Sequence, residues 1–315
     1  MKKSKLARLI AAICCFAMLL TACSSNQTSA ESGGDGSTTA DSEKKVLTYA
    51  IGAETTDLST LYMNNSLYCT SKLVYENLVD FDNGEIVPGL AESWEYNDDQ
   101  TELTFHLRQG VTFHNGEPFN AEAVKTNLEH KQSNPSFYSL KGITDIQEIE
   151  VVDEYTITLH YDHPFYAYLQ DFCWPDVNPM SAPEYIIPGD FQTISGVAGT
   201  GPYIYDEYVA GEYTRFVRNE DYWGETPYWD EIIVKYIPDS TSRLQALQTG
   251  EIDMIYGGTL LTYEEYDQAL AMDGIDGQMA EKDTRVQVIT TNATSPYLSD
   301  IRVRQAIAYA IDKEE

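Results

Sequence analysis

The sequence contains few basic residues. Lysine and arginine number 20 against 50 aspartates and glutamates, which gives a formal net charge of −30 at pH 7. Nucleic acid and anionic membrane surfaces are poor partners for such a chain, because they carry negative charge themselves. This acidity is also typical of a soluble secreted domain, so it does not by itself indicate a cationic ligand.

The short motifs that mark common catalytic centres are also missing. The chain has no G-x-S-x-G nucleophile elbow, no H-E-x-x-H zinc helix and no glycine-rich phosphate loop. Acidic pairs such as Asp98-Asp99 are expected on so acidic a surface and do not indicate a glycosidase. His160 and His163 have no carboxylate or thiol at a recurrent metal-ligand spacing. We therefore predict no enzyme, no cofactor and no metal site; a tethered extracellular hydrolase is the alternative.

Cysteine is scarce as well, with five in the chain. Cys14 and Cys15 lie in the N-terminal apolar run, and Cys23 follows it directly. Cys69 and Cys173 remain, in segments with no evident reason to meet. The sequence leaves open whether these two form a disulfide or are buried separately as small apolar side chains.

The N-terminal apolar run is too short to span a membrane as a mature helix. Four basic residues precede it, and it extends from Leu9 to Leu20, as in a secretory signal. It ends in Leu20-Thr21-Ala22-Cys23, which looks like a bacterial lipobox, although an ordinary signal peptide with a chance cysteine is the alternative. We predict a signal peptide at residues 1–22 and lipidation of Cys23, which anchors the protein without a membrane span.

Residues 23–45 are predicted to form the lipidated cysteine and a flexible linker. The stretch after Cys23 is small, polar and acidic, with almost no apolar content that could pack. A chain of this length and composition holds a domain roughly 25 Å from its anchor. That reach suits a receptor that serves a membrane complex.

Strands and helices mix without regular repetition after residue 45, which argues against a solenoid or a barrel. Strands are predicted at Val46–Ile51, Leu103–Arg108 and Thr156–Tyr161 from their apolar patterning. Helices are predicted at Ser66–Asn77 and from an Asn120 cap through Leu128.

A hairpin is predicted after the turn Gly199-Thr200-Gly201-Pro202. Tyr203–Val209 and Tyr213–Val217 both show strand patterning and are separated by a short break. The two runs are expected to pair as antiparallel strands.

A crossover unit follows the hairpin. Ile232–Ile237 is nearly continuous in apolar residues, and Pro238 ends it. A helix capped by Asp239 or Ser240 and closed by Gly250 leads to a strand at Ile252–Tyr256. The two strands of this unit are expected to be parallel.

Several of these stretches resemble family 5 of the solute-binding proteins of ABC importers, the peptide- and nickel-binding family. The matching stretches, in chain order, are Leu73–Val124, GTGPY at Gly199–Tyr203, RNEDYWGE at Arg218–Glu225, Ile237–Met254 and Ile301–Glu314. The resemblance implies a mixed α/β (α+β) fold of the type II periplasmic-binding-protein kind. In such proteins two lobes close on a solute by a hinge motion.

The resemblance also implies the domain organisation. Lobe I is expected at residues 46–284 with an inserted subdomain at about 65–195. Residues 285–315 are expected to form the start of lobe II, which is incomplete and truncated. A helix after Asp300 carries an apolar stripe with Val303 and Ile307 in it. Relatives continue beyond this helix, so we expect the N-terminal part of a longer binding protein, either a truncated gene product or an incomplete sequence.

The ligand site is predicted from the same resemblance. Clefts of this kind combine aromatic walls with a few polar anchors. Tyr68 matches a ligand-facing position of the nickel binders, and Trp174 and Asp176 lie where those proteins carry arginines that grip a chelator. Phe137 and Tyr138 complete the candidate set. Each aromatic is also compatible with a core position.

No lysine or arginine occurs between Asp171 and Asp190. A bidentate grip on a carboxylate needs the planar fork of arginine, so a peptide is favoured over a nickel chelate. We predict capture of oligopeptides or dipeptides by a monomeric, lipid-anchored, extracytoplasmic protein that delivers them to an ABC permease. A metal chelate is the second hypothesis and an oligosaccharide the third; an adhesive lipoprotein would bind no small ligand saturably.

Overall fold

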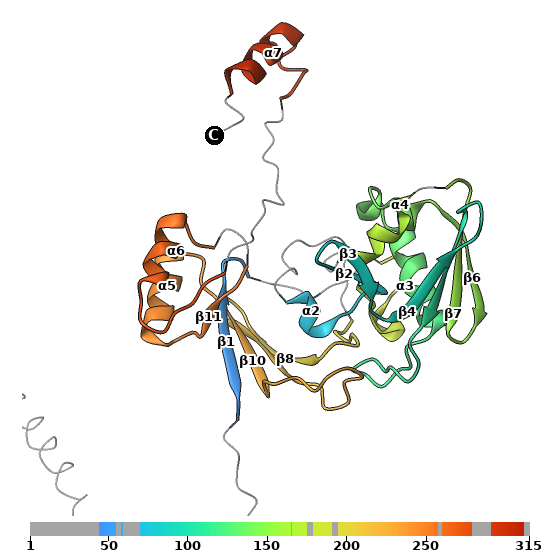
Figure 1. Cartoon of the computed structure of the whole chain (residues 1–315), viewed down its shortest axis with the longest axis horizontal. Coiled ribbons are helices and arrows are strands. Elements are labelled where there is room, and N and C mark those ends of the chain that lie inside the picture. Colours follow the sequence, from blue (N-terminus) through green and yellow to red (C-terminus); the bar gives the residue numbers. More distant parts are fainter. Residues whose placement is uncertain are drawn as a thin grey trace, which may run out of the picture. The chain divides into compact units, whose positions relative to one another are not determined.

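The described part of the chain is a mixture of strands, α-helices and short 3-10 helices (Figure 1). The structure is a computed structural model. It describes residues 44–54, 58, 70–164, 166–174, 179–190, 195–257, 260–278 and 291–311. The predictions on the signal peptide, Cys23, Tyr68, Cys69, Asp176 and the beginning of lobe II near residue 285 lie outside these ranges.

A five-stranded sheet has the strand order β11-β1-β10-β9-β8. β1 (Val46–Ile51) pairs in parallel with β10 (Glu231–Tyr236) on one side and with β11 (Met254–Ile255) on the other. β9 (Tyr213–Arg218) and β8 (Tyr203–Val209) continue the sheet as an antiparallel hairpin. The predicted hairpin and the parallel crossover are confirmed, with β1 inserted between the crossover strands. β11 is shorter than predicted, because only two of its residues pair with β1.

The crossover helix α5 (Ser240–Thr249) begins and ends at the predicted residues. Asp239 accepts a hydrogen bond from the backbone of the third residue after it, and Gly250 closes the helix at a φ of 71°. Ala246 of α5 packs with Ala50 of β1, so the helix covers this part of the sheet (Figure 1). α6 (Tyr263–Leu270) follows and contacts α5.

A four-stranded antiparallel sheet has the order β4-β5-β7-β6. Its strands are β4 (Ala91–Tyr96), β5 (Glu102–Leu107), β6 (Ile146–Asp153) and β7 (Thr156–Tyr161). Alternate residues of β5, from Leu103 to Leu107, are buried, while His106 is partly exposed, as the alternation predicts.

Helix α3 (Ala121–Ser133) packs against β6 and β7 of this sheet (Figure 1). The predicted cap is confirmed, because Asn120 Oδ1 accepts from Ala123 N at 3.0 Å. The smaller elements of this region are β2 (Val79–Asp82), β3 (Glu85–Pro88), η2 (Pro135–Phe137), α4 (Lys141–Thr144), η3 (Tyr168–Cys173) and η4 (Pro183–Tyr185).

Helix α2 (Ser71–Val74) ends earlier than predicted. Tyr75 is extended, with φ −118° and ψ 151°, where the sequence predicts helix to residue 77. The carbonyl of Val74 accepts a hydrogen bond from Gly201 N at 2.9 Å instead of one from the next helical turn. A tertiary partner therefore replaces the intrahelical bond and ends the helix.

Helix α7 (Ile301–Ala310) is capped by Asp300, whose side chain accepts from Arg302 N. None of its residues is buried; in the predicted apolar stripe Val303 is exposed and Ile307 is partly exposed. Within the described ranges, no helix combines the length and the apolar composition needed to cross a bilayer.

Candidate functional site

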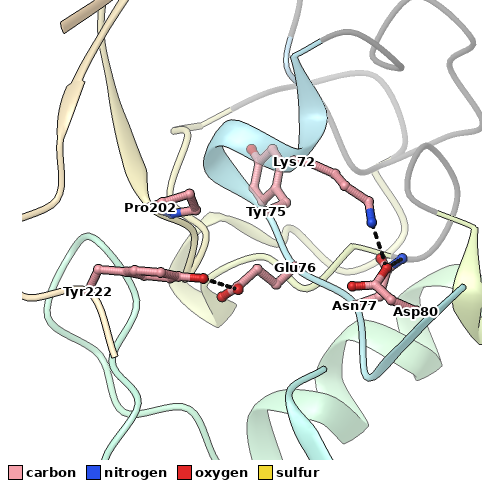
Figure 2. Close-up of a pocket in the computed structure, with 7 residues that line it drawn as sticks. All are labelled: Lys72, Tyr75, Glu76, Asn77, Asp80, Pro202 and Tyr222. Carbon is pink, nitrogen blue, oxygen red and sulfur yellow. Dashed lines mark hydrogen bonds and ion pairs between the residues drawn. The ribbon is translucent and has the colours of Figure 1, made fainter. Parts of the chain in front are cut away.

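Three of the stretches that carry the family resemblance meet at the carboxylate of Glu76. Glu76 Oε2 accepts from Trp223 Nε1 at 2.7 Å and from Thr200 Oγ1 at 2.8 Å. Glu76 Oε1 accepts from the Tyr222 hydroxyl at 2.8 Å, as Figure 2 shows. The Arg108 guanidinium lies 4.3 Å from the centre of the Trp223 ring. The end of α2 is thus tied to the turn before β8 and to the loop after β9.

The environment of Glu76 changes its proton affinity. Burial raises the pKa of this carboxyl above its usual value, and the hydrogen bonds from Trp223, Thr200 and Tyr222 oppose the rise. Burial and the adjacent carboxylate also raise the pKa of Tyr222, so the phenol stays protonated and donates. Because all three donors are already used within the protein, Glu76 serves as a structural junction.

His114 forms a second junction with the same turn. Its backbone N donates to Gly199 O at 2.8 Å, and its ring Nε2 lies 2.9 Å from Gly201 O, to which it donates. Burial lowers the pKa of His114, which favours the neutral ring. Asn219 Nδ2 also donates to Gly201 O, at 3.1 Å. The glycine-rich turn is therefore held from several directions.

A cavity of about 210 Å³ lies beside Glu76 (Figure 2). It is lined by Lys72, Tyr75, Glu76, Asn77, Asp80, Pro202 and Tyr222. Lys72 Nζ pairs with Asp80 Oδ1 at 2.9 Å, and Asn77 Nδ2 donates weakly to the same oxygen at 3.4 Å. Lys72 and Asp80 neutralise each other, Glu76 adds a second carboxylate, and the buried Asn77 Oδ1 has no hydrogen-bond partner among the described residues.

None of the residues around this cavity is among the predicted site residues. Their signal was present, because Glu76 and Asp80 lie in the matched stretch that begins at Leu73 and Tyr222 lies in RNEDYWGE. These stretches gave the resemblance, but only the fold shows that they converge on one carboxylate.

The predicted pair Phe137 and Tyr138 point in different directions. Phe137 is fully buried and packs with Leu140 and Ile143 in a small separate core. Tyr138 is 75% exposed. Of this pair, only Tyr138 presents its ring to solvent.

Trp174 directly follows η3 and is 53% exposed. Its segment is joined to the segment of Tyr138, because Asp171 Oδ2 of η3 accepts from Gly142 N of α4 at 2.7 Å. The structure thus brings the Tyr138 and Trp174 segments together. Tyr68 and Asp176 lie outside the described residues, so their positions relative to this pair stay predictions.

Cys173, beside Trp174, is a buried free thiol. Its Sγ lies 3.7 Å from Leu169 O, and burial raises the pKa of the thiol to about 12. A thiol that stays protonated is a poor nucleophile and a poor metal ligand, so Cys173 contributes packing.

The described residues contain no group of three or more histidine, cysteine or acidic side chains that could hold a metal ion. His160 lies between Glu150, at 3.0 Å, and Glu102, at 3.5 Å, on the exposed face of the four-stranded sheet. These cross-strand pairs stabilise the sheet surface.

Solved structures of periplasmic binding proteins define the class to which this fold belongs. NikA from Brucella suis in complex with Fe(III)-EDTA matches with a TM-score of 0.77 and 32% identity, covering 85% of this chain and 55% of that one. The periplasmic binding protein DppA from Helicobacter pylori in complex with the peptide STSA matches with a TM-score of 0.68 and 26% identity, covering 85% and 57%. The predicted mixed α/β fold of type II periplasmic binding proteins is confirmed.

The sequence comparison identifies the family. Residues 85–315 match the model described as bacterial extracellular solute-binding proteins, family 5 middle, and the chain belongs to this family. The nickel-binding periplasmic protein of Escherichia coli (strain K12) is 33% identical over 263 residues, covering 81% of this chain and 49% of the relative. The chain spans about half the length of the curated relatives it matches. Membership places it in a class of binding proteins and not in an enzyme class, as predicted.

Proposed function

We propose that this chain belongs to an extracellular binding protein that captures oligopeptides or dipeptides and delivers them to an ABC permease. The observation that carries the peptide assignment is the charge of the segment from Asp171 to Asp190, which contains no lysine or arginine. A ligand held mainly through carboxylates would lack its strongest partner there. A peptide can instead use its aromatic and backbone contacts together with an acidic anchor for its amino terminus.

The ligand is contacted, in this proposal, by the exposed rings of Tyr138 and Trp174. Asp176 receives the peptide ammonium, and Tyr68 is a further contact. Phe137, which is fully buried with Leu140 and Ile143, supports the wall without facing the solute. The hydrogen bond from Gly142 N to Asp171 Oδ2 joins the segment that contains Tyr138 to the segment that contains Trp174. This contact supports the proposed arrangement.

A metal chelate is the second candidate ligand. The relative from Escherichia coli is named a nickel-binding protein, and the structure from Brucella suis contains Fe(III)-EDTA; both are more similar in sequence to this chain than the peptide-bound DppA. The lack of a metal-holding group among the described side chains agrees with capture of a chelate more than of a bare ion.

The remaining organisation follows the same proposal. Residues 1–22 are a signal peptide, Cys23 carries lipid, and residues 46–284 form lobe I with an inserted subdomain at about 65–195. β1 pairs with β10 although the proposed inserted subdomain separates the two strands in the sequence. This pairing supports the grouping of both strands in lobe I. The protein acts as a monomer outside the cytoplasm, held at the membrane by its lipid.

Calorimetry tests the ligand assignment. The protein expressed from its complete gene, without residues 1–22, is titrated with dipeptides, with tripeptides and with nickel in the presence and absence of histidine. Heat with peptides supports the proposal, whereas heat only with nickel–histidine replaces it by the chelate assignment. Turnover of peptide or glycan libraries would instead indicate an enzyme.

Tyr138→Ala tests the proposed wall. Removing an exposed aromatic contact is expected to weaken binding of the peptide that gives heat about tenfold. Tyr263→Ala, which removes a ring that is similarly exposed on α6, is the matched control and is expected to leave the dissociation constant unchanged. Equal affinities for both variants would remove Tyr138 from the site.

A further inference from the structure

Helix α3 holds the main chain of residues 179–182, here called the strap. Asn127 Nδ2 donates to Ser181 O at 2.8 Å, and Ser181 N donates back to Asn127 Oδ1 at 3.0 Å. Lys131 Nζ donates to Pro179 O at 2.7 Å. Asn127 and Lys131 are four residues apart, so they lie on one face of α3 and grip successive parts of the strap.

The strap is held from other elements as well. Met180 N donates to the backbone carbonyl of Glu76 at 3.0 Å, and Ala182 N donates to Ala198 O at 2.9 Å. Every residue between Met180 and Ala182 is buried. The strap is therefore an interior main-chain segment whose polar groups are paired with specific partners.

Burying Lys131 at this position costs desolvation free energy. Its side chain is only 1% exposed, and burial lowers the pKa of its ammonium to about 7. An apolar side chain would fill the same volume without the cost of desolvating a charge. The lysine donates a hydrogen bond to Pro179 O, which an apolar residue cannot do.

The strap lies close in sequence to Trp174. The preceding element η3 is fixed by Asp171, which accepts from Gly142 N, and Pro179 is fixed by Lys131. Trp174 thus lies between two anchors that are eight residues apart. The segment from Asp171 to Asp190 has no lysine or arginine of its own, and α3 supplies the Lys131 Nζ donor to it from the interior.

We propose that Lys131 and Asn127 are positioning residues for the solute site: by holding the strap they fix the segment that presents Trp174. This inference rests on the proposed function. Lys131 is too deeply buried to touch a ligand, so its effect passes through the backbone of Pro179. Its role is to keep the site preorganised, which lowers the entropy lost on binding.

The test compares Lys131→Met, Asn127→Asp and Lys125→Met in the protein from the complete gene. Lys131→Met removes the donor to Pro179, and Asn127→Asp keeps the size and the acceptor but removes the donor to Ser181. Lys125→Met makes the same chemical change on the same helix, where Lys125 pairs only distantly with Glu129. Hydrogen–deuterium exchange of the strap amides and iodide quenching of Trp174, taken as the difference from Trp174→Phe, are measured first.

Both strap variants are expected to raise exchange of the Met180, Ser181 and Ala182 amides and the quenching of Trp174, whereas Lys125→Met changes neither. Binding of the dipeptide or nickel–histidine complex that gives heat with the wild type is expected to weaken about tenfold in the strap variants. Unchanged exchange and quenching in the folded Asn127→Asp protein would overturn the inference. Faster amide exchange of the strap with an unchanged affinity for the ligand would overturn it too. If the wild type binds no probe, the proposed function fails, and the exchange and quenching data still decide whether α3 holds the strap.

Discussion

Two ionisable residues of this protein lie where desolvation disfavours their charged forms, and both have specific hydrogen-bond partners there. Glu76 is a partly buried carboxylate with a raised pKa, and three donors from two other stretches of the chain stabilise it. Lys131 is a buried cation with a lowered pKa, and it donates to a main-chain carbonyl. Both residues fix backbone segments that are remote in sequence.

The titration of Lys131 predicts a pH dependence of stability. Its pKa is about 7 in the folded protein against 10.5 when exposed, so between these values the unfolded state binds more protons. The free energy of unfolding therefore rises with pH above about 7, by at most about 1.4 kcal/mol per pH unit from this group. Below pH 7 the lysine is protonated in both states and contributes no slope.

Urea unfolding at pH 7, 8 and 9 checks this expectation by the difference between the wild type and Lys131→Met. The wild type is expected to gain stability relative to the variant as pH rises. His130, whose pKa is lowered by burial and by Lys131, acts mainly below this window. Parallel pH profiles of the two proteins would show that Lys131 is charged alike in the folded and unfolded states.

At the scale of elements, the turn before β8 determines where α2 ends. Gly199 and Gly201 approach the end of α2 so closely that a Cβ at Gly199 would lie 2.0 Å from Val74 O. The same turn receives His114 and Asn219. Glycine is required here for lack of space, which the turn pattern alone does not reveal.

Gly199→Ala is accordingly expected to lower the free energy of unfolding by about 2–3 kcal/mol, because the new methyl group collides with backbone that cannot move independently. Chemical denaturation measures the change, and exchange of the Gly201 amide locates it. An unaltered denaturation midpoint would mean that the contact between α2 and this turn is looser than described.

For the whole molecule, the described residues form a five-stranded sheet and a four-stranded sheet with separate cores, a two-stranded sheet of β2 and β3, and a helix, α7, none of whose residues belongs to either core. The apolar residues of α7, including Ile301 and Val303, are exposed. Because these side chains are exposed, they bury little apolar surface in the described fold and are expected to add little to its stability.

Val303→Gln is therefore expected to change the free energy of unfolding of the 315-residue chain by less than about 0.5 kcal/mol, as for other exposed positions. Val124→Gln in the buried face of α3 is the comparison, and there a loss of several kcal/mol is expected from an unsatisfied buried amide. A large effect of Val303→Gln would show that α7 packs against the rest of the chain.

Local patterns predicted most elements of the fold because their determinants are local. The caps Asn120, Asp239 and Gly250, the hairpin of β8 and β9 and the alternation in β5 were all readable from neighbouring residues. The end of α2 was not, since Gly201, far along the chain, takes the carbonyl that the helix would have used. For the candidate site, sequence selected Tyr138 and Trp174 but missed the residues that hold their segments.

The sequence by itself determined the family and the mixed α/β class. Both follow from the apolar patterning of the sequence and from short stretches that match the family in the same order along the chain. Only the tertiary structure decided that Glu76 joins three of those stretches, that Phe137 is buried while Tyr138 is exposed, and that Lys131 reaches Pro179. The physical reason is that burial and long-range hydrogen bonds depend on which segments meet, and a one-dimensional pattern records only what each segment prefers on its own.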